Sequence, residues 1–342
     1  MTLTPDTFAA AFDAMAPQQN PHAVTAIRHV NDWVAAQGLV VREAARDRFA
    51  RADFGAFAAL VYPTADAAAL DLTADWFAWF FLLDDQLDDG VIGHAPERLA
   101  ALMASILDVV GDRPIEPDAP MIVRALADLW ERTTPVTGPV WRRRFIDHAT
   151  RCALAAVWEA DNRVHATVPS DAEYVTQRRH TGAIYPCMDL IEIVERIELP
   201  DGVYTGELFT RALDAACDVV CWTNDVFSVD KETALGEYHN LVSLHEHWDR
   251  MSRTAALETT MTRIVARLAE FTELQPRVLA AWPGHAEELA GYLAGMRSWM
   301  RGNLDWSAET RRYRDALGGN DTPAQYLESA LVDAVAGRKV GR

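Results

Sequence analysis

Apolar positions along the chain recur at helical spacing, and segments that alternate apolar and polar residues as strands do are hard to find. The pattern predicts helices at about 22–37, 66–89, 97–110, 119–132, 139–164, 171–181, 185–198, 206–233, 250–278 and 284–303. The connections are short and carry helix breakers such as Gly38, Gly90 and Pro200. No low-complexity linker or internal repeat interrupts the series. We therefore expect a single all-α domain, a bundle of about ten to twelve helices.

The most apolar stretch of the chain, 76–83, runs directly into its densest group of carboxylates, 84–89. On a helix Asp84 and Asp88 stack one turn apart, as do Asp85 and Asp89, so the four carboxylates share one broad face. Carboxylates this close either spread into water or coordinate divalent cations, and hard oxygen ligands favour Mg²⁺, Mn²⁺ or Ca²⁺. Taken alone, such a cluster is more often a solvated helix end than a metal site.

A second polar row follows an apolar run on another predicted helix. Residues 215–222 are apolar enough to bury this helix, whereas Asn224, Ser228 and Glu232 follow at positions i, i+4 and i+8. An amide, a hydroxyl and a carboxylate therefore lie on one helix face over about 12 Å. All three are oxygen donors, and polar groups in a row on a buried helix need partners.

Composition and charge narrow the class of protein. With 342 residues, half of them hydrophobic, the chain has ample material for a core, and its net charge of −18 argues against a nucleic-acid partner or an anionic membrane surface. No apolar run is long enough to span a membrane and the N-terminus lacks a signal-peptide pattern, so we expect a cytoplasmic protein without membrane insertion. The four cysteines are expected to be reduced and mostly buried, because no spacing typical of a zinc site accompanies them.

Taken together, the two polar rows resemble the metal-binding motifs of the bacterial class I terpene synthases, also called terpene cyclases. That family pairs a DDxxD motif with an N-D-x-x-S-x-x-x-E motif on the facing helix. Here residues 84–88 match the first motif, and residues 224–232 match the second in full. The resemblance implies a class I terpenoid synthase bundle in which Asp84, Asp88, Asn224, Ser228 and Glu232 hold three Mg²⁺ ions against a substrate diphosphate. Mn²⁺ is expected to substitute for Mg²⁺.

Further positions extend the resemblance to most of the chain. The family has a diphosphate-sensing arginine 46 positions before the Asn of its second motif, which corresponds to Arg178. Lys231 matches its diphosphate-binding lysine, and Arg312-Tyr313 match an Arg-Tyr pair near its C-terminus. The resemblance covers roughly residues 22–315 of a single domain spanning 1–342, and we expect residues 316–342 to form a flexible tail.

In the segment after the sensor arginine, Gly182 fits the family pattern and Thr181 departs from it. Gly182 matches the effector position, where the family breaks a helix and points a backbone carbonyl at the substrate; Pro186 makes such a break physically reasonable. Thr181, however, stands where many relatives have an acidic residue that binds the sensor arginine. A hydroxyl can still hydrogen-bond to Arg178, but less strongly than a carboxylate.

The resemblance implies an enzyme that ionises an isoprenyl diphosphate, releases diphosphate and cyclises the carbocation in an apolar cavity. Farnesyl diphosphate is the expected substrate, with geranylgeranyl and geranyl diphosphates as alternatives. Aromatic rings suit such a cavity because their π faces stabilise cations. The candidates for its walls are Phe57, Trp76, Phe77, Phe80, Trp299 and Trp306, and the best of them are Phe77, Phe80 and Trp306.

Other readings of the motifs differ in testable ways. A chain-elongating prenyltransferase would normally repeat the aspartate-rich motif on the second helix, and a class II cyclase would need a D-x-D-D string, which is absent. A non-catalytic helical interaction protein would have no reason to confine oxygen ligands to two helices. The sequence is compatible with both a monomer and a homodimer.

Overall fold

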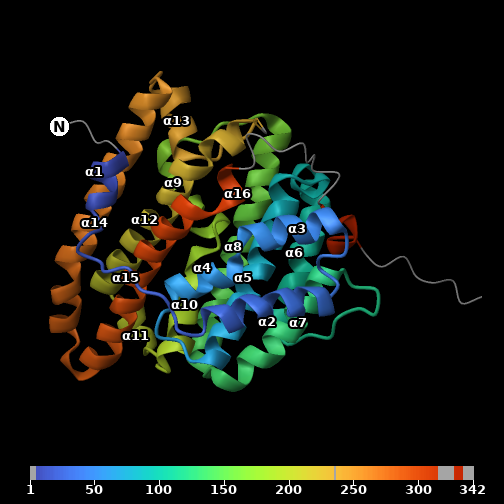
Figure 1. The fold of residues 1–342 in the computed structure, drawn as a ribbon, viewed down its shortest axis with the longest axis horizontal. Helices are drawn as coiled ribbons and strands as arrows, with labels where there is room; N and C mark the ends of the chain where they lie inside the picture. The colour runs from blue at the N-terminus through green and yellow to red at the C-terminus, as the bar shows by residue number, and fades with distance from the viewer. Residues whose placement is uncertain (1–4, 235, 315–326, 334–342) are drawn as a thin grey trace, which may run out of the picture.

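The computed structural model describes residues 5–234, 236–314 and 327–333, and within them every regular element is helical (Figure 1). The longer helices are α2 (Ala23–Ala36), α3 (Glu43–Ala52), α4 (Phe54–Val61), α5 (Ala67–Asp88), α6 (Pro96–Val110), α7 (Met121–Thr133), α8 (Pro139–His165), α9 (Asp171–Thr181), α10 (Ile184–Glu195), α12 (Glu207–Ala234), α13 (Leu241–Trp248), α14 (Arg253–Ala281) and α15 (Ala286–Glu309). Shorter elements are α1 (Pro5–Ala10), α11 (Asp201–Tyr204), α16 (Arg311–Arg314) and the 3₁₀ turns η1 (Val91–His94), η2 (Thr134–Val136), η3 (Pro283–His285) and η5 (Ser329–Leu331). The predicted all-α fold class is confirmed.

All ten predicted helices are present, and most of their ends differ from the prediction by a few residues. Three of the longer helices were not predicted, α3, α4 and α13, and neither were the short helices α1, α11 and α16. Helix α4 is almost entirely apolar and only 8 residues long, so it shows no helical periodicity. The junction between α3 and α4 is Asp53, whose backbone is left-handed at φ 53° and whose carboxylate accepts a hydrogen bond from the Ala56 N–H at 3.2 Å.

Helix α10 lies at the centre of the bundle and is buried along nearly its whole length. It packs against α5, α8, α12 and α15, so the two helices that carry the polar motifs both rest on it. Helix α12 in turn packs against α14 and α15, which form the opposite end of the molecule from α2 and α7 in Figure 1. Among the described residues, no helix is long and apolar enough to cross a membrane.

Helix α5 is anchored by the indoles of its own apolar stretch. The Trp76 N–H donates to the Thr133 hydroxyl at 3.0 Å, and the Trp79 N–H donates to the carbonyl of Ile122 at 2.8 Å, both on α7. The helix ends at Asp88, one residue before the predicted end, and Gly90 follows in a turn where a Cβ atom would clash with the carbonyl oxygen of Gln86. The acidic run therefore stands at the C-terminal end of a firmly buried helix.

Part of the expected tail packs on the bundle. Leu331 is 1% exposed and belongs to the main hydrophobic core. The Glu328 carboxylate accepts hydrogen bonds from the backbone N–H groups of Val41 at 3.0 Å and Arg42 at 2.7 Å, while Asp333 pairs with Arg98 at 2.7 Å. Residues 327–333 therefore pack on the bundle, whereas residues 316–326 and 334–342 lie outside the described residues, and the flexible tail stays a prediction.

Replacing Leu331 with Ala should lower the free energy of unfolding by about 2–5 kcal/mol, because it removes a buried side chain that closes the core at the C-terminal segment. Urea denaturation followed by circular dichroism measures this change. Val136→Ala, at a residue that is 59% exposed, is the control and should shift the free energy by less than about 0.5 kcal/mol. An unchanged denaturation midpoint for Leu331→Ala would contradict this docking.

Candidate active site

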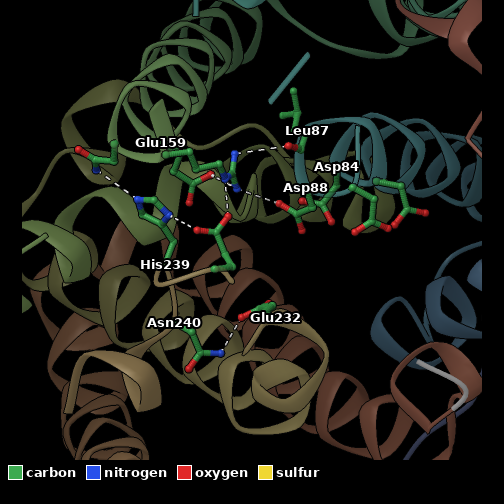
Figure 2. A network of polar contacts seen from close by, with 12 residues as sticks. Asp84, Leu87, Asp88, Glu159, Glu232, His239 and Asn240 are labelled. Carbon is green, nitrogen blue, oxygen red and sulfur yellow. Dashed lines mark hydrogen bonds and ion pairs between the residues drawn. The ribbon is translucent and has the colours of Figure 1, made fainter. Parts of the chain in front are cut away.

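A cavity of about 200 Å³ opens between α5, α8, α10, α12 and α15. Its apolar lining is rich in aromatic rings and includes Phe57, Trp76, Phe77, Trp79, Phe80, Phe81, Phe145 and Trp299. Nine of its polar lining residues form what we call the mouth: Asp84, Asp88, Glu159, Arg163, Arg178, Asn224, Glu232, Glu237 and His239. Figure 2 shows Asp84 and Asp88 on one side of the mouth and Glu232 and His239 on the other.

The first two aspartates of the first motif are held by an arginine from the far end of the chain. The Arg312 guanidinium, only 5% exposed, lies 3.2 Å from the Asp84 carboxylate and 3.0 Å from that of Asp85. Arg48 on α3 also approaches Asp85, at 3.5 Å. Burial opposes ionisation of Asp85, but Arg312 and Arg48 outweigh it and lower the pKa of this carboxyl to about 2. Asp85 therefore forms ion pairs with both arginines.

The other two aspartates have separate partners. Asp88 pairs with Arg163 on α8 at 3.1 Å. The Asp89 side chain is fully buried and pairs with Arg48 at 3.3 Å and with the Lys231 ammonium at 3.8 Å. Of the four carboxylates in the run, Asp84 is the most exposed, at 43% for its side chain.

The second motif presents its oxygens along one face of α12. The Asn224 Oδ1 accepts a hydrogen bond from Arg178 at 2.7 Å, and the Glu232 carboxylate accepts one from the Asn240 amide at 2.7 Å. Burial and the nearby Asp225 raise the pKa of Glu232 to about 7. The Ser228 hydroxyl between them is buried and has no hydrogen-bond partner in the described part of the chain. A buried, unsatisfied oxygen flanked by two further oxygen donors is what a site for a hard cation provides.

The sensor arginine and the helix break lie side by side. Arg178 bonds to Asp225 at 2.9 Å as well as to Asn224, so it is fixed on the second motif. Helix α9 ends at Thr181, Ala183 is left-handed at φ 50°, and α10 begins at Ile184, which is the helix break expected around Gly182. Among the described residues the buried Thr181 hydroxyl has no hydrogen-bond partner, so it does not make the hydrogen bond to Arg178 that a hydroxyl there could make. Asp225 and Asn224 hold the guanidinium instead.

Five of the six predicted aromatic walls line the cavity, Trp76 and Trp299 among them, and the sixth does not. Phe57, Phe77 and Phe80 are part of the lining. Trp306 instead stacks on Phe57, with ring centroids 4.4 Å apart, and its indole N–H donates to the carbonyl of Ala52 at 3.1 Å. Trp306 therefore supports the wall from behind. Tyr313 belongs to α16, but its side chain lies outside the described residues.

Comparison with known proteins agrees with this geometry. A family model described as terpene synthase family 2, C-terminal metal binding, matches residues 75–270, which contain both motifs and Arg178. The chain belongs to the terpene synthase family.

Individual relatives of this terpene synthase are bacterial. It is 33% identical to a (+)-T-muurolol synthase ((2E,6E)-farnesyl diphosphate cyclizing) of Roseiflexus castenholzii, over 86% of this chain and 90% of the relative. It is 34% identical to a (−)-delta-cadinene synthase of Streptomyces clavuligerus, over 94% of this chain and 100% of the relative. The crystal structure of germacradien-4-ol synthase from Streptomyces citricolor superposes with a TM-score of 0.77 at 27% identity, covering 86% of this chain and 96% of that one.

Several residues at the mouth of this terpene synthase escaped the sequence analysis. They are Glu159, Arg163, Glu237 and His239. Each lies outside the two motifs, and each is brought to the mouth only by the packing of α8 and the segment after α12. Arg48 on α3, which pairs with Asp85 and Asp89 beside the mouth, also escaped it. Cys152, Cys187 and Cys221 also line the cavity, and the four cysteines are unbonded and at least half-buried, as predicted.

Replacing Gly182 with Ala should reduce the kcat/KM of this terpene synthase by about 10–100-fold, because small misplacements of a binding group are costly. A Cβ atom there would lie 2.9 Å from Nη1 of Arg178 and 3.3 Å from Sγ of Cys221, so the guanidinium would have to move. Steady-state kinetics measures the effect. Gly202→Ala is the matched control, because a Cβ atom at that position would meet no neighbouring group within 4 Å. Equal kinetics for both variants would contradict the role assigned to Gly182.

Proposed function

We propose that this chain is a Mg²⁺-dependent class I sesquiterpene synthase that ionises farnesyl diphosphate and cyclises the resulting carbocation. The observation that carries this proposal is the position of the two oxygen-rich motifs on opposite sides of the mouth of an aromatic cavity. The printed name of the Roseiflexus relative specifies farnesyl diphosphate, which supports a C15 substrate. A cytoplasmic location and the choice between monomer and homodimer stay predictions.

The donor set at the mouth fits a metal that is shared with a ligand. Among the described residues, no three His, Cys, Asp or Glu side chains are grouped so that they could hold a metal by themselves. The site instead offers Asp84 and Asp88 across from Asn224 and Glu232, with the buried Ser228 hydroxyl between the latter two on α12, so a diphosphate would have to complete the coordination. Bound Mg²⁺, three ions in the proposal, supplies the positive charge that stabilises a leaving diphosphate.

The cations of the chain would then change partners. Arg178 now bonds to Asn224, and Arg312 bonds to Asp84, so both are within reach of the same mouth. Once a metal neutralises the motif oxygens, these guanidiniums and Lys231 can donate hydrogen bonds to phosphate oxygens. Tyr313 is proposed to act with them. Charge-assisted hydrogen bonds of this kind favour heterolysis of the C–O bond, in which the electron pair leaves with the diphosphate.

The apolar part of the cavity would protect and shape the cation. Phe57, Phe77 and Phe80 contribute π faces to the lining, and their quadrupoles attract a positive charge. Burial also excludes water, which would otherwise capture the cation. Trp299 contacts both Phe57 and Phe77 and lines the cavity as well, so the aromatic wall is continuous from α4 through α5 to α15.

Replacing Glu232 with Ala should abolish product formation, because it removes the only carboxylate of the second motif's ligand row. The fold should be retained, which circular dichroism checks. Asp230→Ala, at a residue on the same helix whose side chain is 60% exposed, is the control and should retain activity. Removing divalent metal with a chelator should abolish product formation by both the wild type and the control until Mg²⁺ is added back. Turnover by Glu232→Ala at the wild-type rate would defeat the metal assignment.

Incubation with geranyl, farnesyl and geranylgeranyl diphosphates in the presence of Mg²⁺ tests the substrate. Gas chromatography with mass spectrometry should show cyclic products, with the highest kcat/KM for the C15 substrate. A higher kcat/KM for the C20 substrate would reassign the protein as a diterpene synthase. If none of the three gave a product, the non-catalytic helical interaction protein would replace the enzyme.

A further inference from the structure

A buried arginine outside both motifs sits at the centre of the mouth. Arg163 lies near the end of α8, and its side chain is 7% exposed. Its Nη2 contacts the Asp88 carboxylate at 3.1 Å, its Nη1 donates to the carbonyl of Leu87 at 3.4 Å, and its Nε donates to the carboxylate of Glu237. Glu159, one turn earlier on α8, is 3.8 Å away. One guanidinium thus joins the end of α5 to the segment that follows α12.

That segment, 236–240, returns to α8 through Glu237 and His239. Glu237 bonds to the His239 ring at 2.7 Å, and the other ring nitrogen of His239 contacts the Asn162 amide at 3.2 Å. The His239 carbonyl accepts a hydrogen bond from the Tyr174 hydroxyl at 3.1 Å. The conformation of 236–240 is therefore fixed by side chains of α8 and α9.

The same segment ends on the second motif. The Asn240 amide donates to the Glu232 carboxylate at 2.7 Å and to the carbonyl of Asp225 at 2.9 Å. A continuous path therefore runs from Asp88 through Arg163 and the segment 236–240 to Glu232, and Figure 2 shows both of its ends facing the mouth.

We propose that Arg163 is a positioning residue that sets the spacing of the two metal motifs before metal binds. Its planar fork contacts Asp88 and Glu237 at once, and this is a geometry that a lysine ammonium cannot reproduce. Without the guanidinium, Asp88, Glu159 and Glu237 would repel one another and the segment 236–240 would lose its tie to α5. The inference rests on the proposed function, because it assigns Arg163 a role toward the metal ions of that site.

A second arginine on the same helix provides a matched control. Arg144 has the same side-chain exposure as Arg163, 7%, and it also pairs with two acidic residues, Asp189 at 3.5 Å and Glu192. It does not line the cavity. Loss of Arg144 should therefore destabilise the fold without affecting metal binding.

The test is the rise in melting temperature that Mg²⁺ produces in the presence of inorganic pyrophosphate, measured as a function of Mg²⁺ concentration. Arg163→Gln should raise the half-saturating Mg²⁺ concentration by about tenfold or more, as expected when a residue that orients metal ligands is removed. Arg163→Lys should recover only part of this loss. Arg144→Gln should lower the melting temperature of the metal-free protein and leave the half-saturating Mg²⁺ concentration unchanged.

The Glu237→Gln variant distinguishes a positioning role of Arg163 from a purely electrostatic one. This variant keeps the charge of Arg163 and removes a negative charge from the mouth, so a purely electrostatic role for Arg163 predicts equal or tighter binding of pyrophosphate with Mg²⁺. A positioning role predicts that Glu237→Gln binds pyrophosphate with Mg²⁺ more weakly than the wild type. It also predicts that the Arg163→Gln/Glu237→Gln double variant binds no more weakly than Arg163→Gln alone, because both changes break the same link.

A folded Arg163→Gln variant with the wild-type Mg²⁺ midpoint would overturn the inference, as would an equal shift in Arg144→Gln. If Arg163→Gln does not fold, the Glu237→Gln variant is the test. Binding of pyrophosphate with Mg²⁺ by this variant that equals or exceeds that of the wild type overturns the inference. Failure of the wild-type protein to be stabilised by Mg²⁺ and pyrophosphate would instead contradict the proposed function itself. The two failures are therefore distinguishable.

Discussion

Mutual repulsion among the carboxylates at the mouth of the cavity is the constraint on which the site depends. Four aspartates crowd the end of α5, and in the described structure each has a cationic partner. These cations come from four separate elements: Arg48 from α3, Arg163 from α8, Lys231 from α12 and Arg312 from α16. Neutralising the acidic run therefore also draws together helices that are distant in sequence, with the mouth at their meeting point.

The same arrangement explains how a protein with a net charge of −18 can receive an anion. Two of the cations that neutralise the motifs, Arg163 and Arg178, line the cavity in which a diphosphate would lie in the proposed function. There, metal ions would take over the oxygens of Asp84 and Asn224, and this would free Arg312 and Arg178 to bind phosphate. Asp85 and Asp89 would keep Arg48 as a common partner, which distinguishes them from Asp84 and Asp88.

Much of the fold and both motifs could be predicted from the sequence, because helical periodicity and fixed spacing along one helix are local properties. Helix α4 was missed because an apolar segment without periodicity does not reveal its structure. The place of Trp306 behind Phe57 depends on how α15 packs on α4, and no spacing rule gives that packing. Arg163 was missed for the same reason: its importance lies in partners 75 and 74 positions away, Asp88 and Glu237.

The most direct measurement of the central claim is anomalous diffraction from crystals grown with Mn²⁺ and inorganic pyrophosphate. We expect Mn²⁺ peaks within coordination distance of Asp84 on α5 and of the Asn224, Ser228 and Glu232 row on α12, with pyrophosphate oxygens completing the coordination. Peaks found only beside Asp85 and Asp89, or an absence of peaks between the two helices, would contradict it.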